Sequence, residues 1–155
     1  MGSGKSTIGP VLAKKLGYRF VDIDREIENE HAMTISEVFA QRGELYFREK
    51  EAEKIAELAR AKHAVIATGG GAMIEEINVK NAKAGGVIVY LKLPFDILYN
   101  RIKNDSGRPL VAANTPEKLE EIYNRRAPVY SACADLVIDA DFSVSDIVKN
   151  ITDLL

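Results

Sequence analysis

The chain has 155 residues, of which 46% are hydrophobic and 28% charged, as is typical of a single soluble globular domain. A net charge of -2 gives no overall attraction to nucleic acid or to an anionic membrane, so we expect neither as a partner. No apolar run approaches the ~18 residues of a membrane span, and no signal-peptide pattern is present. A single cysteine, Cys133, excludes an internal disulfide and fits a cytoplasmic location.

Short β-rich runs alternate with longer helical ones along the chain. A first helix with apolar positions at Val11, Leu12 and Leu16 is expected to stop at Gly17. The sequence predicts further helices from Thr34, over 44–62, over 95–104, from Thr115 and from Ser143. It predicts strands at 20–23, 64–67, 87–93 and 136–139. This order predicts an α/β fold with three layers, in which helices flank a central parallel sheet and ligands bind at the carboxyl ends of the strands.

The start of the chain has the end of a G-x-x-x-x-G-K-[ST] phosphate loop: Gly2, Ser3, Gly4, Lys5, Ser6 and Thr7. In such a loop, backbone N–H groups and the positive end of the next helix face phosphate oxygens. Lys5 is expected to reach the β- and γ-phosphates of ATP, and the Ser6 hydroxyl to hold Mg²⁺. A simple Gly/Ser turn capping a helix is the alternative, but the helix that follows favours nucleotide binding.

The motif is incomplete at its amino end. Counting back from Gly4, the first glycine of the motif would precede Met1 by two residues, and the strand that feeds such a loop is missing too. Loss of that strand would leave unpaired backbone groups on its neighbours. We therefore expect the natural chain to begin about ten residues upstream. A non-functional fragment is the alternative.

Two pairs of charged residues have informative spacings. Asp22 and Asp24 stand two apart at a predicted strand end, so both can face one side. Taken alone, they are equally well explained as solvated carboxylates. Arg48 and Glu51 stand three apart on a predicted helix and share a face. A surface ion pair is the commoner explanation for that spacing.

Three further segments combine glycine, proline and arginine. Three consecutive glycines at 69–71 follow a predicted buried strand and allow close approach of a ligand to the backbone, although a flexible turn explains them equally. Arg108 lies in a polar segment over 105–114 that we expect to be a mobile loop. Arg126 begins an R-x-P-x-Y motif that ends at Tyr130.

Together these motifs resemble the shikimate kinase family from Met1 to about Leu155. The matching stretches, in the order of the family, are MGSGKST, FVDIDREIE, ISEVFAQRGELYFREKE, ATGGGA, RPLV, RRAPVY and ADLVID. The resemblance implies a P-loop nucleoside-triphosphate-hydrolase-like fold of the nucleoside-monophosphate-kinase type. It implies one kinase domain over 1–155, with a substrate-binding helical region at about 24–62 and a lid at about 105–115. The implied reaction is ATP-dependent phosphorylation of the 3-hydroxyl of shikimate, a step of aromatic amino-acid biosynthesis.

The resemblance also implies roles for single residues at the substrate. Asp24 would contact the substrate hydroxyls as the base candidate, while Asp22 would bind Mg²⁺ through water. Arg48 and Arg126 would grip the shikimate carboxylate. Glu51 would hold Arg48, and the loop of Gly69, Gly70 and Gly71 would lie against the substrate.

Two more arginines would serve the nucleotide. Arg108 would bring a cation to the phosphates with the lid. Arg101 resembles a position that stacks on adenine, although it could equally be a solvated helix residue. Arg125 lies beside Arg126 and complicates that assignment, which we base on the spacing to Pro128.

Two other function classes are compatible with parts of this pattern. A gluconate or nucleotide kinase would share the phosphate loop, but is not expected to carry the aspartate pair, Arg48 with Glu51, the triple glycine and Arg126 together. A catalytically dead nucleotide-binding module would explain the incomplete motif. No long apolar face is left over, so we expect a monomer.

Overall fold

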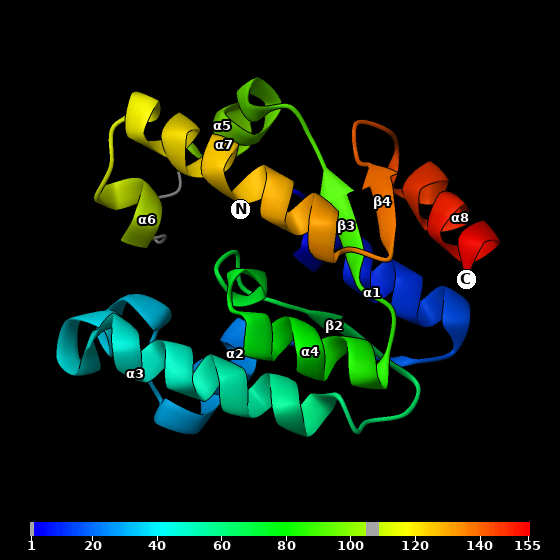
Figure 1. Cartoon of the computed structure of the whole chain (residues 1–155), viewed down its shortest axis with the longest axis horizontal. Helices are drawn as coiled ribbons and strands as arrows, with labels where there is room; N and C mark the ends of the chain where they lie inside the picture. Colours follow the sequence, from blue (N-terminus) through cyan, green and yellow to red (C-terminus); the bar gives the residue numbers. More distant parts are fainter. Residues whose placement is uncertain (1, 105–108) are drawn as a thin grey trace.

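The structure is a computed structural model that describes residues 2–104 and 109–155. Helices and strands alternate along the chain as predicted (Figure 1). In chain order the elements are α1 Lys5–Leu16, β1 Arg19–Asp22, α2 Ile23–His31, α3 Ile35–Leu58, β2 Ala64–Ala67, η1 Ala72–Ile74, α4 Glu76–Gly85, β3 Val89–Lys92, α5 Phe95–Ile102, α6 Pro109–Ala112, α7 Pro116–Cys133, β4 Leu136–Asp139 and α8 Val144–Leu154.

The strands form two parallel pairs. β1 pairs with β2 in the register Arg19 to Ala64, and β3 pairs with β4 in the register Val89 to Leu136. Within the described residues the two pairs are separate two-stranded sheets, as expected if the strand that feeds the phosphate loop is lacking between its neighbours. A cavity of about 100 Å³ is lined by Thr68, just after β2, and by residues of β3. Parallel pairing itself is confirmed.

Helices cover the strands on both sides and complete an α/β architecture. α1 contacts β1 and β2 as well as α8, and α8 packs on β4, so α1 ties the two strand pairs together. Figure 1 shows α7 running past β3, with α3 and α4 beside β2 in the other half of the molecule. One apolar cluster, centred on Leu12, Leu91 and Ile147, lies under α1 and α8, while the other lies around α2 and α3.

Local signals placed most elements correctly. Thr34 and Glu37 form the predicted capping box, and Gly17 ends α1 in a left-handed conformation. In the helix predicted over 44–62 the apolar residues Leu45, Ile55 and Leu58 were expected to share the buried face, but Leu45 is 75% exposed, just after a bend at Gly43. α4 was not predicted, because its one fully buried residue is Asn78, and Val79 and Ala82 pack only partly buried on the core. None of the helices in the described part of the chain is long and apolar enough to cross a membrane.

Candidate active site

The phosphate loop turns sharply before α1. Gly2 and Gly4 have φ values of 63° and 89°, a left-handed conformation that favours glycine. The carbonyl of Gly4 accepts the first helical hydrogen bonds, from the N–H groups of Thr7 (3.0 Å) and Ile8 (2.8 Å). The residues from Gly2 to Thr7 therefore present the amino end of α1, where N–H groups and the helix dipole attract anions.

Helix α5 closes one side of this loop. A Cβ at Gly2 would lie 2.7 Å from Cγ2 of Ile102, so the loop backbone fits against α5 only because no side chain is present. Arg101 is the neighbour of Ile102 on α5 and is exposed. The structure thus places Arg101 on the helix that borders the phosphate loop, which is compatible with either of the two roles weighed for it.

Asp22 and Asp24 lie at the junction between β1 and α2. Asp22 is the last residue of β1 and caps α2, and its Oδ1 accepts a hydrogen bond from the N–H of Asp24 (3.2 Å). Asp24 lies in the first turn of α2, which corrects the expectation that strand alternation sets its direction. The cap sets the geometry of the pair instead, and keeps both carboxylates at the carboxyl end of β1.

The Ser6 hydroxyl donates a hydrogen bond to Oδ2 of Asp22 at 3.2 Å. A hydroxyl and a carboxylate oxygen side by side are hard donors of the kind that Mg²⁺ prefers. No group of three or more His, Cys, Asp or Glu side chains suited to a metal exists in residues 2–104 and 109–155. That small donor set fits Mg²⁺, which usually keeps several waters and binds substrate phosphates besides one or two protein ligands.

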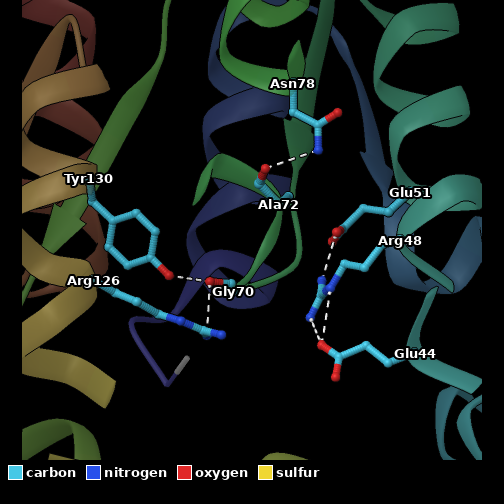
Figure 2. Close-up of polar contacts among 8 residues, drawn as sticks. All are labelled: Glu44, Arg48, Glu51, Gly70, Ala72, Asn78, Arg126 and Tyr130. Carbon is cyan, nitrogen blue, oxygen red and sulfur yellow. Dashed lines mark hydrogen bonds and ion pairs between the residues drawn. The ribbon is translucent and has the colours of Figure 1, made fainter. Parts of the chain in front are cut away.

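Arg48 is held by two carboxylates on its own helix, as Figure 2 shows. Its Nη1 donates to Oε2 of Glu51 at 2.7 Å, and its Nη2 and Nε donate to Oε1 of Glu44 at 3.2 and 3.4 Å. The side chain of Glu51 is fully buried, whereas that of Glu44 is 64% exposed. Glu51 therefore fixes the guanidinium, and Glu44 is the partner that solvent or an incoming anion can most readily replace.

The triple glycine packs directly on this network. A Cβ at Gly71 would lie 2.6 Å from Cζ, Nη1 and Nη2 of Arg48. A Cβ at Gly69 would collide with Oε1 of Glu51 and come within 3.2 Å of Oδ1 of Asp24. Gly69 and Gly71 thus allow the loop to pack closely on charged side chains.

Burial and neighbouring charges have opposite effects on the pKa values of Glu51 and Arg48. Burial raises the pKa of Glu51, and the nearby Asp24 carboxylate adds to that shift, while Arg48 works against it. For Arg48, burial alone would lower the pKa, but the charges and hydrogen bonds of Glu51 and Glu44 outweigh it and the pKa is raised. Arg48 therefore stays a cation.

Helix α7 reaches the same loop from the other side. Nη1 of Arg126 donates to the carbonyl of Gly70 at 3.3 Å, and the hydroxyl of Tyr130 donates to that carbonyl as well (Figure 2). Arg126 is half-buried, while its neighbour Arg125 is exposed. Of the two arginines, the structure brings Arg126 to the glycine loop.

One cavity joins the phosphate loop to this region. Ser3, Lys5, Gly69, Gly70 and Arg126 all line the cavity beside β3. Figure 2 shows Arg126 on one side of the glycine loop and Arg48 on the other. Lys5 and the two arginines therefore gather around one short loop. The expected lid residue Arg108 lies outside the described residues, and residues 109–112 of the expected lid form α6, which contacts α3.

Comparison with known proteins identifies the family. The model of the shikimate kinase family matches residues 1–155, the whole chain. The chain belongs to the shikimate kinase family. The shikimate kinase of Persephonella marina is 41% identical over 141 residues, which cover 91% of this chain and 85% of that protein. The shikimate kinase of Geobacter sulfurreducens is 43% identical over 153 residues, covering 97% of this chain and 84% of the relative.

Solved structures agree with the family assignment. Shikimate kinase from Acinetobacter baumannii in complex with shikimate superposes with a TM-score of 0.94 at 36% identity, covering 99% of this chain and 87% of that one. A gluconokinase from Sinorhizobium meliloti has a TM-score of 0.53 at 17% identity, a likeness of fold alone. The P-loop kinase fold predicted from the motifs is thus confirmed, and the match is to shikimate kinases.

Sequence reasoning assigned no role to three residues around the shikimate kinase site, although it named Tyr130 as the end of the R-x-P-x-Y motif. Glu44 stands four residues before Arg48, and Tyr130 stands four after Arg126, so helix periodicity could have found both. Asn78 is only 1% exposed and donates from Nδ2 to the carbonyl of Ala72 at 3.0 Å, which holds the turn after the glycines. No local sequence signal indicates Asn78, because its partner lies on η1.

Proposed function

We propose that this chain transfers the γ-phosphate of ATP to the 3-hydroxyl of shikimate, giving shikimate 3-phosphate and ADP. The observation that carries the proposal is the arrangement around the glycine loop. Lys5 and Arg126 line one cavity there, and Arg48 contacts the loop at Gly71. A polyphosphate and a small carboxylic acid could therefore bind at adjoining sites.

The two arginines are the proposed carboxylate site. A guanidinium presents a planar fork of N–H donors that matches a carboxylate, and two of them can hold one acid from both sides. Arg48 is fixed by Glu51 at 2.7 Å, so it is oriented before any ligand arrives. In this proposal the carboxylate of shikimate takes the place of the exposed Glu44 at Arg48, and the backbone of Gly69, Gly70 and Gly71 lies against the ring.

Asp24 is proposed to orient the acceptor hydroxyl and to accept its proton. It lies against Gly69 and near Glu51. Its N–H donates to Asp22, which in turn accepts from Ser6 of the phosphate loop. Phosphoryl transfer depends mainly on position and charge neutralisation, so an oriented hydroxyl in line with the γ-phosphate is the chief requirement.

Lys5 and the amino end of α1 are proposed to neutralise the phosphates of ATP. Mg²⁺ bound by Ser6 and, through water, by Asp22 would supply further positive charge at the β- and γ-phosphates. Arg101 is proposed to contact the adenine, because it lies on the helix that borders the loop. The role of Arg108 as the lid cation stays a prediction, as do a monomeric state and a cytoplasmic location.

A coupled assay of ADP release tests this function. The chain is incubated with MgATP and shikimate, gluconate or nucleoside monophosphates in parallel. We expect turnover when shikimate is the acceptor and none with gluconate or nucleoside monophosphates. Arg48→Ala should raise the KM for shikimate more than it lowers kcat. Preference for gluconate or a nucleotide, or ATP binding without turnover by any acceptor, would contradict the proposal.

A further inference from the structure

Tyr130 is the end of the R-x-P-x-Y motif, and the proposed reaction leaves it without a role. Its hydroxyl donates to the carbonyl of Gly70, 60 residues away in the chain. Arg126 donates to the same carbonyl from one turn earlier in α7. Two donors on one helix thus converge on a single acceptor, which a carbonyl oxygen with two lone pairs can satisfy.

Fixing this carbonyl fixes the peptide group that precedes Gly71. A trans peptide is planar, so the N–H of Gly71 points opposite to the C=O of Gly70. No described peptide bond is cis. The carbonyl is turned toward α7, and Gly71 packs so closely on the guanidinium of Arg48 that no Cβ fits between them. The orientation of this one peptide therefore sets the contact between the loop and Arg48.

The two donors differ in the partners that they meet when substrate binds. Arg126 is proposed to grip the substrate carboxylate, and its hydrogen bond to Gly70 is long, at 3.3 Å. An arginine that turns to an anion weakens or gives up its bond to a neutral carbonyl, since hydrogen bonds between ionised partners are the stronger ones. Tyr130 has no competing charge to meet and would be left as the donor on Gly70.

We propose that Tyr130 is a positioning residue, whose hydroxyl holds the Gly70 carbonyl so that the glycine loop keeps its shape when Arg126 engages the substrate. The ring is held independently of the hydroxyl, because it packs on Tyr90 with ring centroids 5.4 Å apart. Burial raises the pKa of Tyr130, so the phenol keeps the proton that it donates. This inference rests on the proposed function, since it assigns Arg126 to the carboxylate.

Tyr130→Phe removes the hydroxyl and leaves the ring. The matched control is Tyr123→Phe on the same helix, whose hydroxyl donates to the carbonyl of Leu93 at 2.8 Å. Both variants lose one phenol-to-carbonyl bond, so their melting temperatures should fall alike. For Tyr130→Phe alone, we expect the KM for shikimate to rise roughly tenfold, with kcat and the KM for ATP within about twofold of the unmodified chain.

Amide hydrogen exchange gives an independent readout. Residues 68–74 should exchange faster in Tyr130→Phe than in Tyr123→Phe, above all with shikimate bound. Equal KM values and equal exchange in the two variants would overturn the inference. Failure of Tyr130→Phe to fold where Tyr123→Phe folds would overturn it too, because the bond would then serve global stability. Turnover of shikimate by the unmodified chain is measured first, so failure of the proposed function is seen separately.

Discussion

Alanine at Gly71 should impair shikimate binding through Arg48 alone. Gly71 has φ -101° and ψ -15°, a conformation that alanine adopts without strain, so the backbone is not at issue. The added Cβ would stand 2.6 Å from three atoms of the guanidinium, where ordinary contact begins at 3.4 Å. Arg48 must therefore withdraw by about 0.8 Å, the difference between those two distances.

The size of the effect follows from the bond that this movement strains. A shift of that size can take the 2.7 Å contact between Arg48 and Glu51 to the edge of hydrogen-bond range. A hydrogen bond to a charged group contributes about 1.5–3 kcal/mol, which corresponds to roughly a 10- to 100-fold rise in the KM for shikimate. Since Lys5 and the amino end of α1 are not displaced, the KM for ATP should stay within about twofold.

The assay is steady-state ADP release with shikimate varied at saturating ATP. Gly86→Ala is the matched control, because Gly86 has extended backbone and a Cβ there meets nothing within 4 Å. A Gly71→Ala chain with the same KM for shikimate as Gly86→Ala would refute the reasoning that the glycine loop sets the position of Arg48. A fall in affinity for ATP as large as that for shikimate would refute it as well.

Three further predictions concern single side chains. Lys5→Ala should lower kcat by about 100- to 1,000-fold with little change in the KM for shikimate, and an unchanged kcat would remove Lys5 from the mechanism. Asn78→Ala should lower the urea unfolding free energy by about 1–3 kcal/mol, because a buried hydrogen bond is lost and the carbonyl of Ala72 keeps only the long bond from the N–H of Glu75 (3.4 Å). A loss no larger than in the exposed Asn150→Ala would contradict this. Glu51→Gln should gain stability relative to the unmodified chain as pH rises, because the pKa of Glu51 is raised in the fold. The stability that Glu51 contributes through this raised pKa is present below about pH 4.5 and is lost once the pH exceeds the pKa of the folded state. Urea unfolding of both chains between about pH 4 and pH 8 checks this, and parallel pH profiles would contradict it.

Much of the fold could be predicted because its signals are local. Capping residues such as Thr34 and Thr115, and the glycine at 17, mark helix ends through bonds to their own neighbours. The register of the strand pairs could not be predicted, because pairing joins residues more than 40 positions apart, such as Arg19 and Ala64. Asn78 was missed for the same reason on a smaller scale, since its partner lies on another element.

The residues of the site likewise fall into those that local spacing predicts and those that tertiary packing places. The phosphate loop and the pair of Arg48 and Glu51 are contiguous or share a helix face, so their spacing predicts them. Asp24 was expected to follow strand alternation at a strand end, whereas a cap at Asp22 starts a helix there. The spacing to Pro128 favoured Arg126 over Arg125, and Arg126 is the arginine that meets the glycine loop, although the packing of α7 that brings it there lies outside the motif.

The central claim is that the phosphate loop and two guanidinium groups serve one cleft. A crystal structure of this chain with shikimate and a non-hydrolysable ATP analogue tests it most directly. We predict the carboxylate of shikimate within hydrogen-bond distance of both Arg48 and Arg126, and the 3-hydroxyl between Asp24 and the γ-phosphate beside Lys5. A carboxylate bound away from Arg48 and Arg126, or a 3-hydroxyl turned away from Lys5, would contradict the account.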